Sequence, residues 1–316
     1  MPKSGHNTVL VVAGPTASGK SNLAVDVAEE FGGVVINADS MQIYEGLEIV
    51  TAAPDPAARQ RAPHKIYGIR DPAIPCSAGD WVVLAEQEIC LAHEGGLLPI
   101  IVGGTGMYLR TLMTGIAQMP PVAPEIRDGV RSRLAQDGST ALYAELAEFD
   151  PESAARINAS DSQRVARAVE IYEATSRTLT EWQRDNSEES AGAAYNFKTV
   201  LLEPPRDLLY ATCNARFKKM LASGALEEIR ALAMRNLDAT LPAMKALGIP
   251  HLLQHLAGEI SLEEACTAGQ QSTRNYVKRQ ETWFRNKFIA DLSVKSQYND
   301  SVKTNIFSFI SKFMLT

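Results

Sequence analysis

The residues of this chain best suited to chemistry lie in the segment GPTASGKS, from Gly14 to Ser21. A glycine followed after four residues by Gly19, Lys20 and Ser21 is the spacing of a phosphate-binding loop, or P-loop. Glycines let backbone N–H groups turn toward phosphate oxygens, and the N-terminus of a following helix adds partial positive charge. Lys20 adds a full charge, and the Ser21 hydroxyl can reach a Mg²⁺ ion. The segment therefore predicts a site for a diphosphate-like anion.

The acidic residue that most nucleotide-hydrolysing P-loop proteins carry near the phosphates is missing from its usual place. In those proteins a carboxylate at the end of a neighbouring strand holds the Mg²⁺ shell. Here the apolar run LPIIV, which is typical of such a strand, is followed by GGTG at Gly103–Gly106. We therefore expect the loop to hold a diphosphate for chemistry other than hydrolysis of a nucleoside triphosphate.

Two further segments follow apolar runs and should face the same crevice. Asp39 comes directly after VVINA, and Thr105 lies in the GGTG segment. By itself Asp39 could cap a helix or act as a general base or Mg²⁺ ligand. The GGTG segment could be a tight turn or a second anion-binding nest. Together they suit a nucleophile that loses a proton to Asp39 while a diphosphate leaves toward Lys20 and Thr105.

The elements that must position these residues alternate in the manner of an α/β protein. Strands are expected at 8–13, 34–38 and 97–104, and helices at 21–32 and 79–96. Strands separated by helix-length segments imply a doubly wound parallel sheet, in which ligands bind outside the carboxyl ends of the strands.

The middle of the chain has a different character, since its segments are charged, helical and free of strands. We predict an inserted all-helical domain at 119–196 and a catalytic core formed by 1–118 and 197–316. A strand at 197–204 and helices from 206 to about 288 would complete the core. The tail from 289 to 316 carries no recognisable motif.

Composition indicates an ordinary globular protein of the cytoplasm. Of the 316 residues, 45% are hydrophobic and 22% charged, and the four cysteines are far apart, as suits reduced thiols. The late apolar stretch 306–315 contains Lys312 and is about half a membrane span. The net charge of −6 gives no global sign of a nucleic-acid partner, although a local basic patch can lie on an acidic protein.

Such a patch occurs in the segment TRNYVKRQETWFRNK. It carries several lysines and arginines against a single acid, Glu281. At helical spacing Arg274, Lys278 and Arg285 share a face with Glu281, so the segment is either a solvated, salt-bridged helix or a surface for an RNA backbone. The segment SDSQRVARAVE leaves the same two interpretations open.

The chain resembles the bacterial tRNA dimethylallyltransferases, also called tRNA isopentenyltransferases, from about Val9 to Asn286. The resemblance rests on the order and spacing of GPTASGKS, NADSMQIYEGLEI, IVGGTGMYLRTL, DSQRVARAVEIYEAT and TRNYVKRQETWFR. It implies a P-loop kinase-like core with a helical insertion. It also implies transfer of the dimethylallyl group of dimethylallyl diphosphate to N6 of the adenosine 3′ of the anticodon, position 37, with Mg²⁺ present.

The resemblance also implies roles for individual residues. Asp39 matches the general base, and Thr105 and Arg216 match residues that steady the bridging oxygen of the leaving diphosphate. The implied donor-binding residues are Gly14, Thr16, Ala17, Ser18, Gly19, Lys20 and Ser21, with Ser21 also the Mg²⁺ ligand. The implied tRNA-binding residues are Asp39, Ser40, Met41, Gln42, Thr105, Arg127, Gln163, Arg164, Val165, Ala166, Arg167, Lys245, Lys278, Arg279 and Gln280.

Four positions depart from the family pattern, and at one of them Ser21 replaces a threonine but retains the hydroxyl. Val50 replaces a glycine, Ala53 replaces a lysine, and Ile249 replaces an aromatic residue. We expect the catalytic reaction to survive these changes. The property that we expect them to affect is the affinity for tRNA.

Two other functional classes remain as alternatives. A small-molecule kinase would hold ATP in the P-loop and use Asp39 as a base toward a hydroxyl, but it needs an acidic Mg²⁺ ligand that is missing after LPIIV. An RNA-binding NTPase switch would leave Asp39 and Thr105 unexplained. The main prediction is therefore a monomeric enzyme with the tRNA anticodon stem-loop and dimethylallyl diphosphate as partners, and no membrane.

Overall fold

The computed structural model describes residues 7–115, 119–185 and 195–314. The chain divides into two compact units. Unit 1 comprises Met1–Met113 and Gly192–Thr316, and unit 2 is Thr114–Ala191. The sequence placed the corresponding division at 119–196, a few residues further along the chain.

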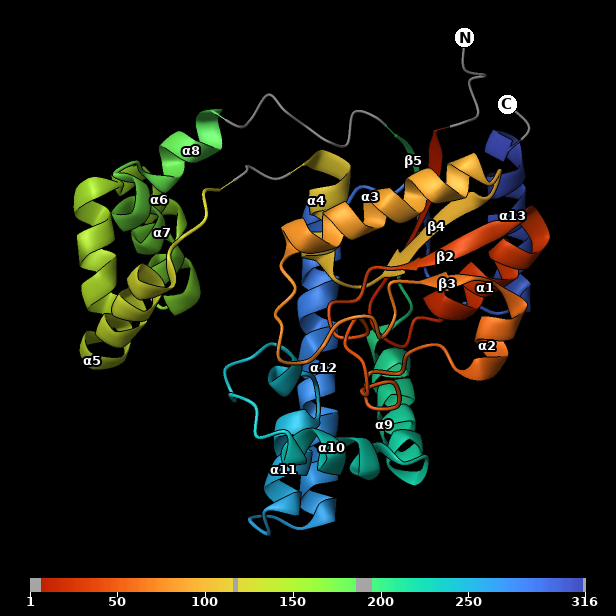
Figure 1. The fold of residues 1–316 in the computed structure, drawn as a ribbon. Helices are drawn as coiled ribbons and strands as arrows, with labels where there is room; N and C mark the ends of the chain where they lie inside the picture. The colour runs from red at the N-terminus through yellow and green to blue at the C-terminus, as the bar shows by residue number, and fades with distance from the viewer. Residues whose placement is uncertain (1–6, 116–118, 186–194, 315–316) are drawn as a thin grey trace. The chain divides into compact units, whose positions relative to one another are not determined.

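Unit 1 is built on a sheet of parallel strands (Figure 1). The strands are β1 (Thr8–Ala13), β2 (Gly33–Asn37), β3 (His64–Lys65), β4 (Leu98–Gly103), β5 (Asn196–Leu202) and β6 (Leu292–Val294). Their order is β3-β2-β4-β1-β5-β6, and each neighbouring pair is parallel. The predicted doubly wound α/β class is confirmed, although the short strands β3 and β6 were not predicted.

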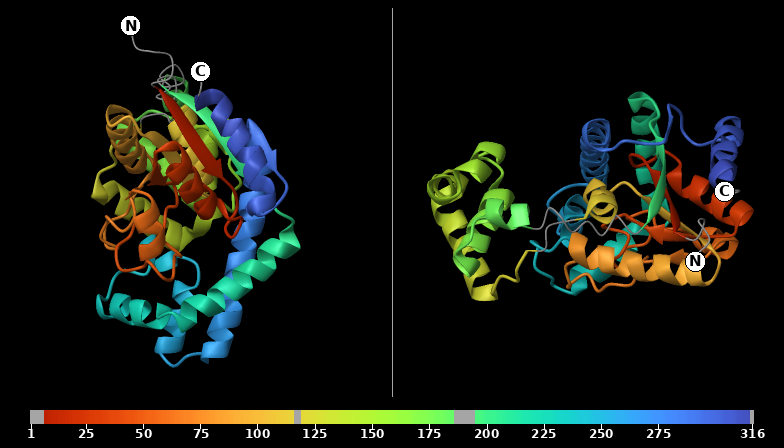
Figure 2. Two further views of the ribbon diagram at one scale, coloured as in Figure 1. Left: turned by 90° about the vertical axis from the view of Figure 1, so that its right-hand side faces the viewer. Right: turned by 90° about the horizontal axis from the view of Figure 1, so that it is seen from above.

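Helices cover both faces of the sheet because its central strands bury side chains on both sides. Successive side chains of a strand point to opposite faces, so Val9 and Val11 of β1 enter one hydrophobic core and Leu10 and Val12 the other. Helices α1 (Lys20–Phe31) and α13 (Asp300–Met314) pack on the second core, and α3 (Ala78–Glu94) on the first (Figure 2).

Further helices belong to unit 1, and those between β5 and β6 extend below the sheet in Figure 1. The further helices are α2 (Pro56–Arg61), α4 (Gly106–Thr114), α9 (Arg206–Ala222), α10 (Ala225–Met234), η2 (Ala243–Lys245), α11 (Ile249–Leu256) and α12 (Leu262–Lys287). The long helix α12 begins at a capping box, in which Ser261 accepts from Glu264 N–H and the Glu264 carboxylate accepts from Ser261 N–H.

The described residues of unit 2 form helices. These are α5 (Pro124–Phe149), α6 (Pro151–Arg156), α7 (Ser162–Thr175) and α8 (Leu179–Asp185). Helix α5 is broken at Gly138, whose φ of 80° and ψ of 170° are not helical. A core that includes Val130, Leu146 and Val169 joins α5 to α7.

Within the described ranges, no helix is both long enough and apolar enough to cross a bilayer. All four cysteines are free thiols.

Candidate active site

The three predicted segments meet at the carboxyl ends of β1, β2 and β4. Ala38 N–H donates to Val102 O at 2.7 Å, and Thr105 N–H donates to Ala38 O at 3.3 Å. A Cβ on Gly103 would lie 2.1 Å from Ala38 O, so only glycine allows this approach. The prediction that the P-loop, Asp39 and Thr105 share one edge of the sheet is confirmed.

The P-loop presents open donors to this edge. Gly19, with φ of 90°, is the N-cap of α1 and makes no side-chain cap, so the first N–H groups of the helix remain for a ligand. Ser18 Oγ is fully buried and, among the described residues, has no hydrogen-bond partner. An unpartnered buried hydroxyl beside a helix N-terminus fits a loop built to surround an anion.

Asp39 is held in place by a buried asparagine. Asn37 Oδ1 accepts from Asp39 N–H at 2.8 Å, and Asn37 Nδ2 donates to Asp39 O at 3.0 Å. Trp81 Nε1 donates to Asn37 O at 2.7 Å, which fixes the end of β2 against α3. The Asp39 carboxylate accepts from Met41 N–H at 2.9 Å and lines a pocket described below.

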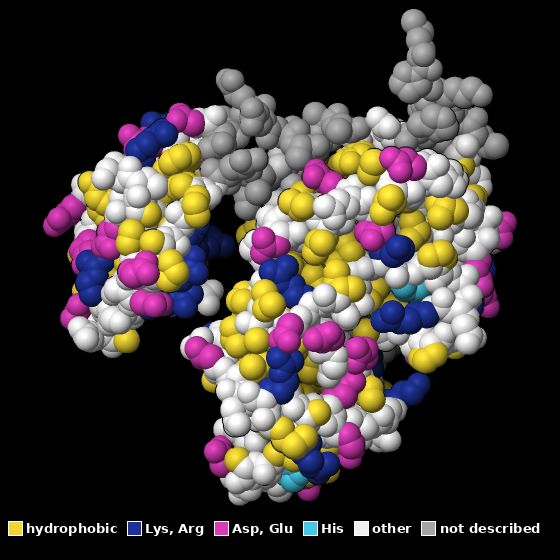
Figure 3. Space-filling view, viewed as in Figure 1, with side chains coloured by type: hydrophobic (Ala, Val, Ile, Leu, Met, Phe, Trp, Pro, Cys, Tyr) yellow, Lys and Arg dark blue, Asp and Glu magenta, His cyan; other side chains and the backbone are white. Residues whose placement is uncertain are grey.

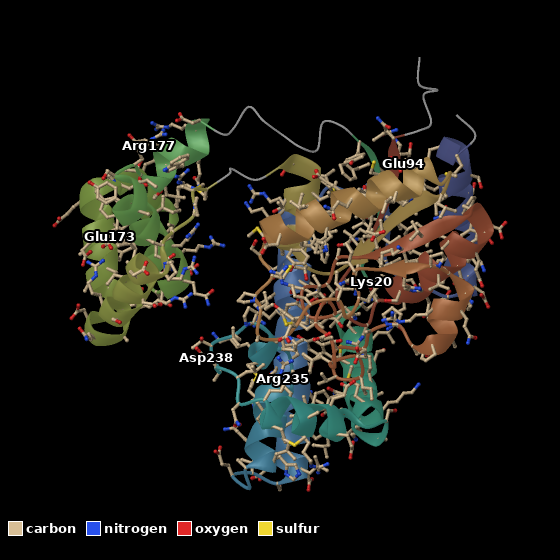
Figure 4. All side chains as sticks on the ribbon, in the orientation of Figure 1. Lys20, Glu94, Glu173, Arg177, Arg235 and Asp238 are labelled. Atoms are coloured by element: carbon tan, nitrogen blue, oxygen red, sulfur yellow. The ribbon has the colours of Figure 1, made fainter. Side chains whose placement is uncertain are left out.

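Two cations lie near Asp39. Burial lowers the pKa of Lys20 to about 8, and the nearby charge of Asp39 partly offsets that effect. Burial also lowers the pKa of Arg216, which reaches in from α9 and donates to Thr16 Oγ1. Figure 4 shows Lys20 between the strands and the helices α9 and α12. Since burial removes water from both cations, an anion bound between them would replace the lost solvation with a favourable electrostatic interaction.

Thr105 connects the third segment to the Asp39 turn. Its Oγ1 accepts from Ser40 N–H at 3.0 Å and donates to Ser40 Oγ at 3.4 Å. Burial raises the pKa of Tyr276 from α12, whose hydroxyl lies close to Thr105 and Gln280. The phenol therefore stays protonated and can serve as a donor.

Gln280 of α12 lies inside the site rather than on its surface. Its Oε1 accepts from Thr16 N–H at 2.8 Å, and its Nε2 donates to Gly104 O at 2.8 Å. A Cβ on Gly104 would lie 2.2 Å from Gln280 Nε2, so the glycine makes room for the amide. Gln280 thus fastens the P-loop to the GGTG segment.

A pocket of about 200 Å³ opens between these residues. Its polar lining includes Asp39, Thr16 and Arg216, and its apolar lining includes Met41, Val50, Phe217, Met220 and Leu247. A pocket with cationic side chains beside an apolar wall suits a ligand that carries both an anionic group and a short hydrocarbon chain.

Some predicted tRNA-binding residues lie at this pocket. Lys245 and Arg279 line it, and the Arg279 guanidinium lies 5.4 Å from the centre of the Tyr276 ring. Lys278 is exposed on α12. Gln42 instead donates to Thr51 O and Ala52 O, so its amide fastens the loop after β2.

Other predicted tRNA-binding residues lie in unit 2. Gln163 and Arg164 are exposed on the first turn of α7, and Arg127 is half-buried on α5. Arg167 pairs with Glu170 at 3.3 Å. The side chains of Val165 and Ala166 lie in the helical core, so only the exposed residues of this segment could contact RNA. That contact stays a prediction.

Several residues in the pocket or behind it were not predicted from the sequence. Asn37 and Trp81 support Asp39 from beneath, and Phe217 and Met220 form the apolar wall. Met220 follows Arg216 by four residues on α9, so helical periodicity would have placed it on the same face. Nothing in the local sequence distinguishes Asn37 or Trp81 from ordinary core residues.

The residues fit a metal that arrives with a diphosphate better than one held by protein ligands alone. The described parts of the chain contain no group of three His, Cys, Asp or Glu residues arranged to hold a metal ion. Mg²⁺ is commonly bound by one or two protein groups together with substrate phosphates. Ser21, at the start of α1, and Asp39 are the groups available for that arrangement.

Two family models match the chain. One, described as IPP transferase, matches residues 42–287, and the other, described as Isopentenyl transferase, matches residues 7–69.

Curated relatives are similar over nearly the whole length. The tRNA dimethylallyltransferase of Rhodopseudomonas palustris (strain BisB18) is 50% identical over 287 residues, which are 91% of this chain and 90% of its own. That of Paramagnetospirillum magneticum (strain ATCC 700264 / AMB-1) is 46% identical over 313 residues, 99% of each chain.

Solved structures with the same fold carry related descriptions. The full-length tRNA isopentenylpyrophosphate transferase from Bacillus halodurans is 31% identical, with a TM-score of 0.70 over 98% of this chain and 97% of its own. A eukaryotic dimethylallyltransferase acting on tRNA is 26% identical, with a TM-score of 0.82 over 97% of this chain and 80% of its own.

Proposed function

The chain belongs to the tRNA dimethylallyltransferase family, whose members prenylate tRNA, and we propose the acceptor atom and the residues that act on it. In this proposal the dimethylallyl group passes from dimethylallyl diphosphate to N6 of the adenosine 3′ of the anticodon, position 37. Diphosphate is released.

One observation carries the proposal: a single carboxylate, Asp39, shares a pocket with a cationic end and an apolar wall. Arg216 lines the cationic end of the pocket, and Lys20 lies near enough to interact with Asp39 and Arg216, so the two cations suit the diphosphate of the donor. The wall, which includes Phe217 and Met220, suits its hydrocarbon chain. Asp39 lies at the same pocket, where it can meet an incoming amine.

The reaction needs a base and a stabilised leaving group, because an aromatic exocyclic amine is a weak nucleophile. In the proposed step N6 forms a bond to C1 of the donor while the C1–O bond breaks. The bonding pair of C1–O leaves with the diphosphate, next to Lys20, Arg216 and Thr105. The proton lost by N6 passes to Asp39.

Magnesium would be held by the Ser21 hydroxyl and the diphosphate oxygens. Its contribution when bound is to neutralise charge on the diphosphate. The residues of the chain still provide the orientation: the first N–H groups of α1 and the Arg216 guanidinium would face the anion, and Asp39 would face the amine.

The acceptor adenosine has to leave the stack of the anticodon loop to reach Asp39, which a single-stranded loop permits at modest cost. We assign Lys245, Lys278 and Arg279 to the phosphates around it, with Ser40 and Met41 near the base. In unit 2 we assign Gln163 and Arg164 to the anticodon arm. Lysines, arginines and acids are mixed on the face seen in Figure 3, so local clusters rather than net charge would guide the RNA.

We also propose that the enzyme acts in the cytoplasm and as a monomer. A sizing column coupled to light scattering, with and without tRNA, tests the second point.

A two-donor assay tests the function. The protein and Mg²⁺ are incubated with an unmodified anticodon stem-loop, and either dimethylallyl diphosphate or ATP is added. Mass spectrometry of the RNA should show a gain of one C₅H₈ unit with the prenyl donor only, and none with Asp39→Ala. Consumption of ATP without any gain by the RNA would favour the small-molecule kinase instead.

A further inference from the structure

A short turn of the C-terminal tail is hydrogen-bonded to the P-loop. Gln297 and Tyr298 lie in this turn, between β6 and α13. Gln297 Nε2 donates to Ala17 O at 2.8 Å and to Thr212 Oγ1 of α9 at 2.9 Å. The backbone N–H of Tyr298 donates to Ser18 O at 3.1 Å. Two successive P-loop carbonyls are therefore held by two successive residues of the tail.

The P-loop has a backbone shape that needs such support. Ala17 has φ of 66°, in the left-handed region that a residue with a Cβ disfavours. A conformation of this kind persists only where surrounding contacts determine it. The bond from Gln297 to Ala17 O is one such contact. At Gly19, with φ of 90°, a Cβ would lie 2.9 Å from Tyr298 Cβ, so the tail and the loop are in close contact there.

Tyr298 also joins the tail to the helix that follows the P-loop. Its hydroxyl donates to Asp26 Oδ2 of α1 at 2.6 Å. Burial and the Asp26 carboxylate raise the pKa of Tyr298, which keeps the phenol protonated as a donor. Lys303 of α13 contacts the same Asp26 oxygen at 3.3 Å, and Arg61 contacts the other oxygen at 2.8 Å. The tail is thus anchored on α1 while it holds the loop.

We propose that Gln297 and Tyr298 are positioning residues of the donor site, which hold the P-loop in its anion-binding shape before the diphosphate arrives. The inference rests on the proposed function, because that function makes a diphosphate the ligand of the loop. Neither residue lines the pocket that contains Asp39, so their effect reaches the donor through Ala17, Ser18 and Gly19. A loop already in its bound shape binds an anion without losing affinity to reorganisation.

The test uses the full chain with substitutions in the turn. Gln297→Ala removes both side-chain hydrogen bonds. Gln297→Glu keeps the shape but presents an oxygen to Ala17 O. Tyr298→Phe removes only the bond to Asp26 and keeps the backbone N–H on Ser18 O. Lys295→Ala is the matched control, because Lys295 is exposed and pairs with Glu203 outside the loop.

Calorimetry with inorganic diphosphate should give a Kd about tenfold higher for Gln297→Ala, equivalent to about 1.4 kcal/mol. Gln297→Glu should bind diphosphate at least as weakly as Gln297→Ala does. The Kd of Tyr298→Phe should be about threefold above the wild-type value, and that of Lys295→Ala should be unchanged. In the prenylation assay the KM for dimethylallyl diphosphate should rise in parallel, while the KM for tRNA stays within about twofold.

An unchanged diphosphate Kd for Gln297→Ala, with or without a lower melting temperature, would overturn the proposal and leave the turn a purely structural role. Equal increases in the KM values of both substrates would overturn it as well. If the wild-type protein binds diphosphate but prenylates no RNA, the proposed function fails. In that case the diphosphate Kd values of the variants still test the positioning role of Gln297 and Tyr298.

Discussion

Gln280 and Thr16 are joined across the site by a hydrogen bond of 2.8 Å between Gln280 Oε1 and the Thr16 backbone N–H. The opposite end of the same amide donates to Gly104 O. With 5% of its surface exposed, Gln280 has no access to water that could replace these partners. One buried amide therefore sets the spacing between the two loops that face the diphosphate.

Gln280→Glu should reduce kcat/KM for dimethylallyl diphosphate by about tenfold or more. The substitution keeps the length of the side chain but leaves Gly104 O without its donor, and an unsatisfied buried group costs about 1–3 kcal/mol. Steady-state kinetics with tRNA at saturation measures the effect. Gln271→Glu, exposed on the same helix, is the control and should stay close to wild type. Wild-type kcat/KM in Gln280→Glu would show that the spacing of the loops does not matter.

Asp39→Asn should lower the rate of prenyl transfer by about 10²–10⁴-fold, the usual contribution of a general base. The amide oxygen can still accept from Met41 N–H, so the turn after β2 should keep its shape. Single-turnover kinetics isolates the chemical step, and inorganic diphosphate binding reports on the donor end of the pocket. A rate within threefold of wild type, together with intact tRNA binding, would remove Asp39 from the proton transfer.

Diphosphate binding should weaken as pH rises through about 8, because burial lowers the pKa of Lys20 to that value and the neutral amine loses its attraction for the anion. Bound diphosphate favours the charged amine, so it should move this midpoint upward. Titration of Kd between pH 7 and about 9.5 measures the dependence. The same titration with Lys20→Met separates the lysine from protonation of diphosphate itself, and identical profiles for the two proteins would contradict the assignment.

The lowered pKa of Lys20 also affects stability. Whereas diphosphate binding should weaken as pH rises, the free energy of unfolding should increase. Between about 8 and the unfolded value near 10.5, the unfolded chain binds the proton of Lys20 and the folded chain does not. The ligand-free protein should therefore gain stability from this group as pH rises through that window. Denaturant unfolding of wild type and Lys20→Met at several pH values would detect the difference, and parallel curves would argue against it.

The sequence predicted the sheet edge well because its signals are local. The P-loop spacing, the apolar runs and the residues directly after them place Gly14–Ser21, Asp39 and Thr105 together by the rules of parallel sheets. Arg216 came from family resemblance alone. Its burial and its bond to Thr16 depend on how α9 packs, which no spacing along the chain reveals.

The parts that could not be predicted depend on contacts between distant segments. Gln280 was expected to bind tRNA from a basic helix, yet its side chain is buried, and its amide is bonded to Thr16 N–H and Gly104 O because α12 passes next to the P-loop. Strand β6 is only Leu292–Val294, too short for a pattern, and it is defined by its pairing with β5, which is distant in the sequence. The departures Val50 and Ile249 prove to be core residues of unit 1, and Val50 also lines the pocket, so they bear on packing and on the pocket wall rather than on the reacting groups.

Gly269→Ala should destabilise unit 1, although alanine is the better helix former by about 1 kcal/mol. A Cβ at this position in α12 would lie 2.3 Å from Cζ of Phe217, and the Phe217 ring is also confined by Gly248. Overpacking of a filled core costs about 1–3 kcal/mol, so the clash outweighs the gain in helix propensity.

Gly129→Ala in α5 of unit 2 is the matched control, because a Cβ there would meet nothing within 4 Å and should stabilise its helix. Denaturant unfolding can be followed by circular dichroism. Gly269→Ala should lower the denaturant concentration at the unfolding midpoint of unit 1, and Gly129→Ala should raise that of unit 2. Because Phe217 lines the pocket, Gly269→Ala should also raise the KM for dimethylallyl diphosphate. A stabilised Gly269→Ala protein would mean that the Phe217 ring moves freely, and the apolar wall would then not be a fixed surface.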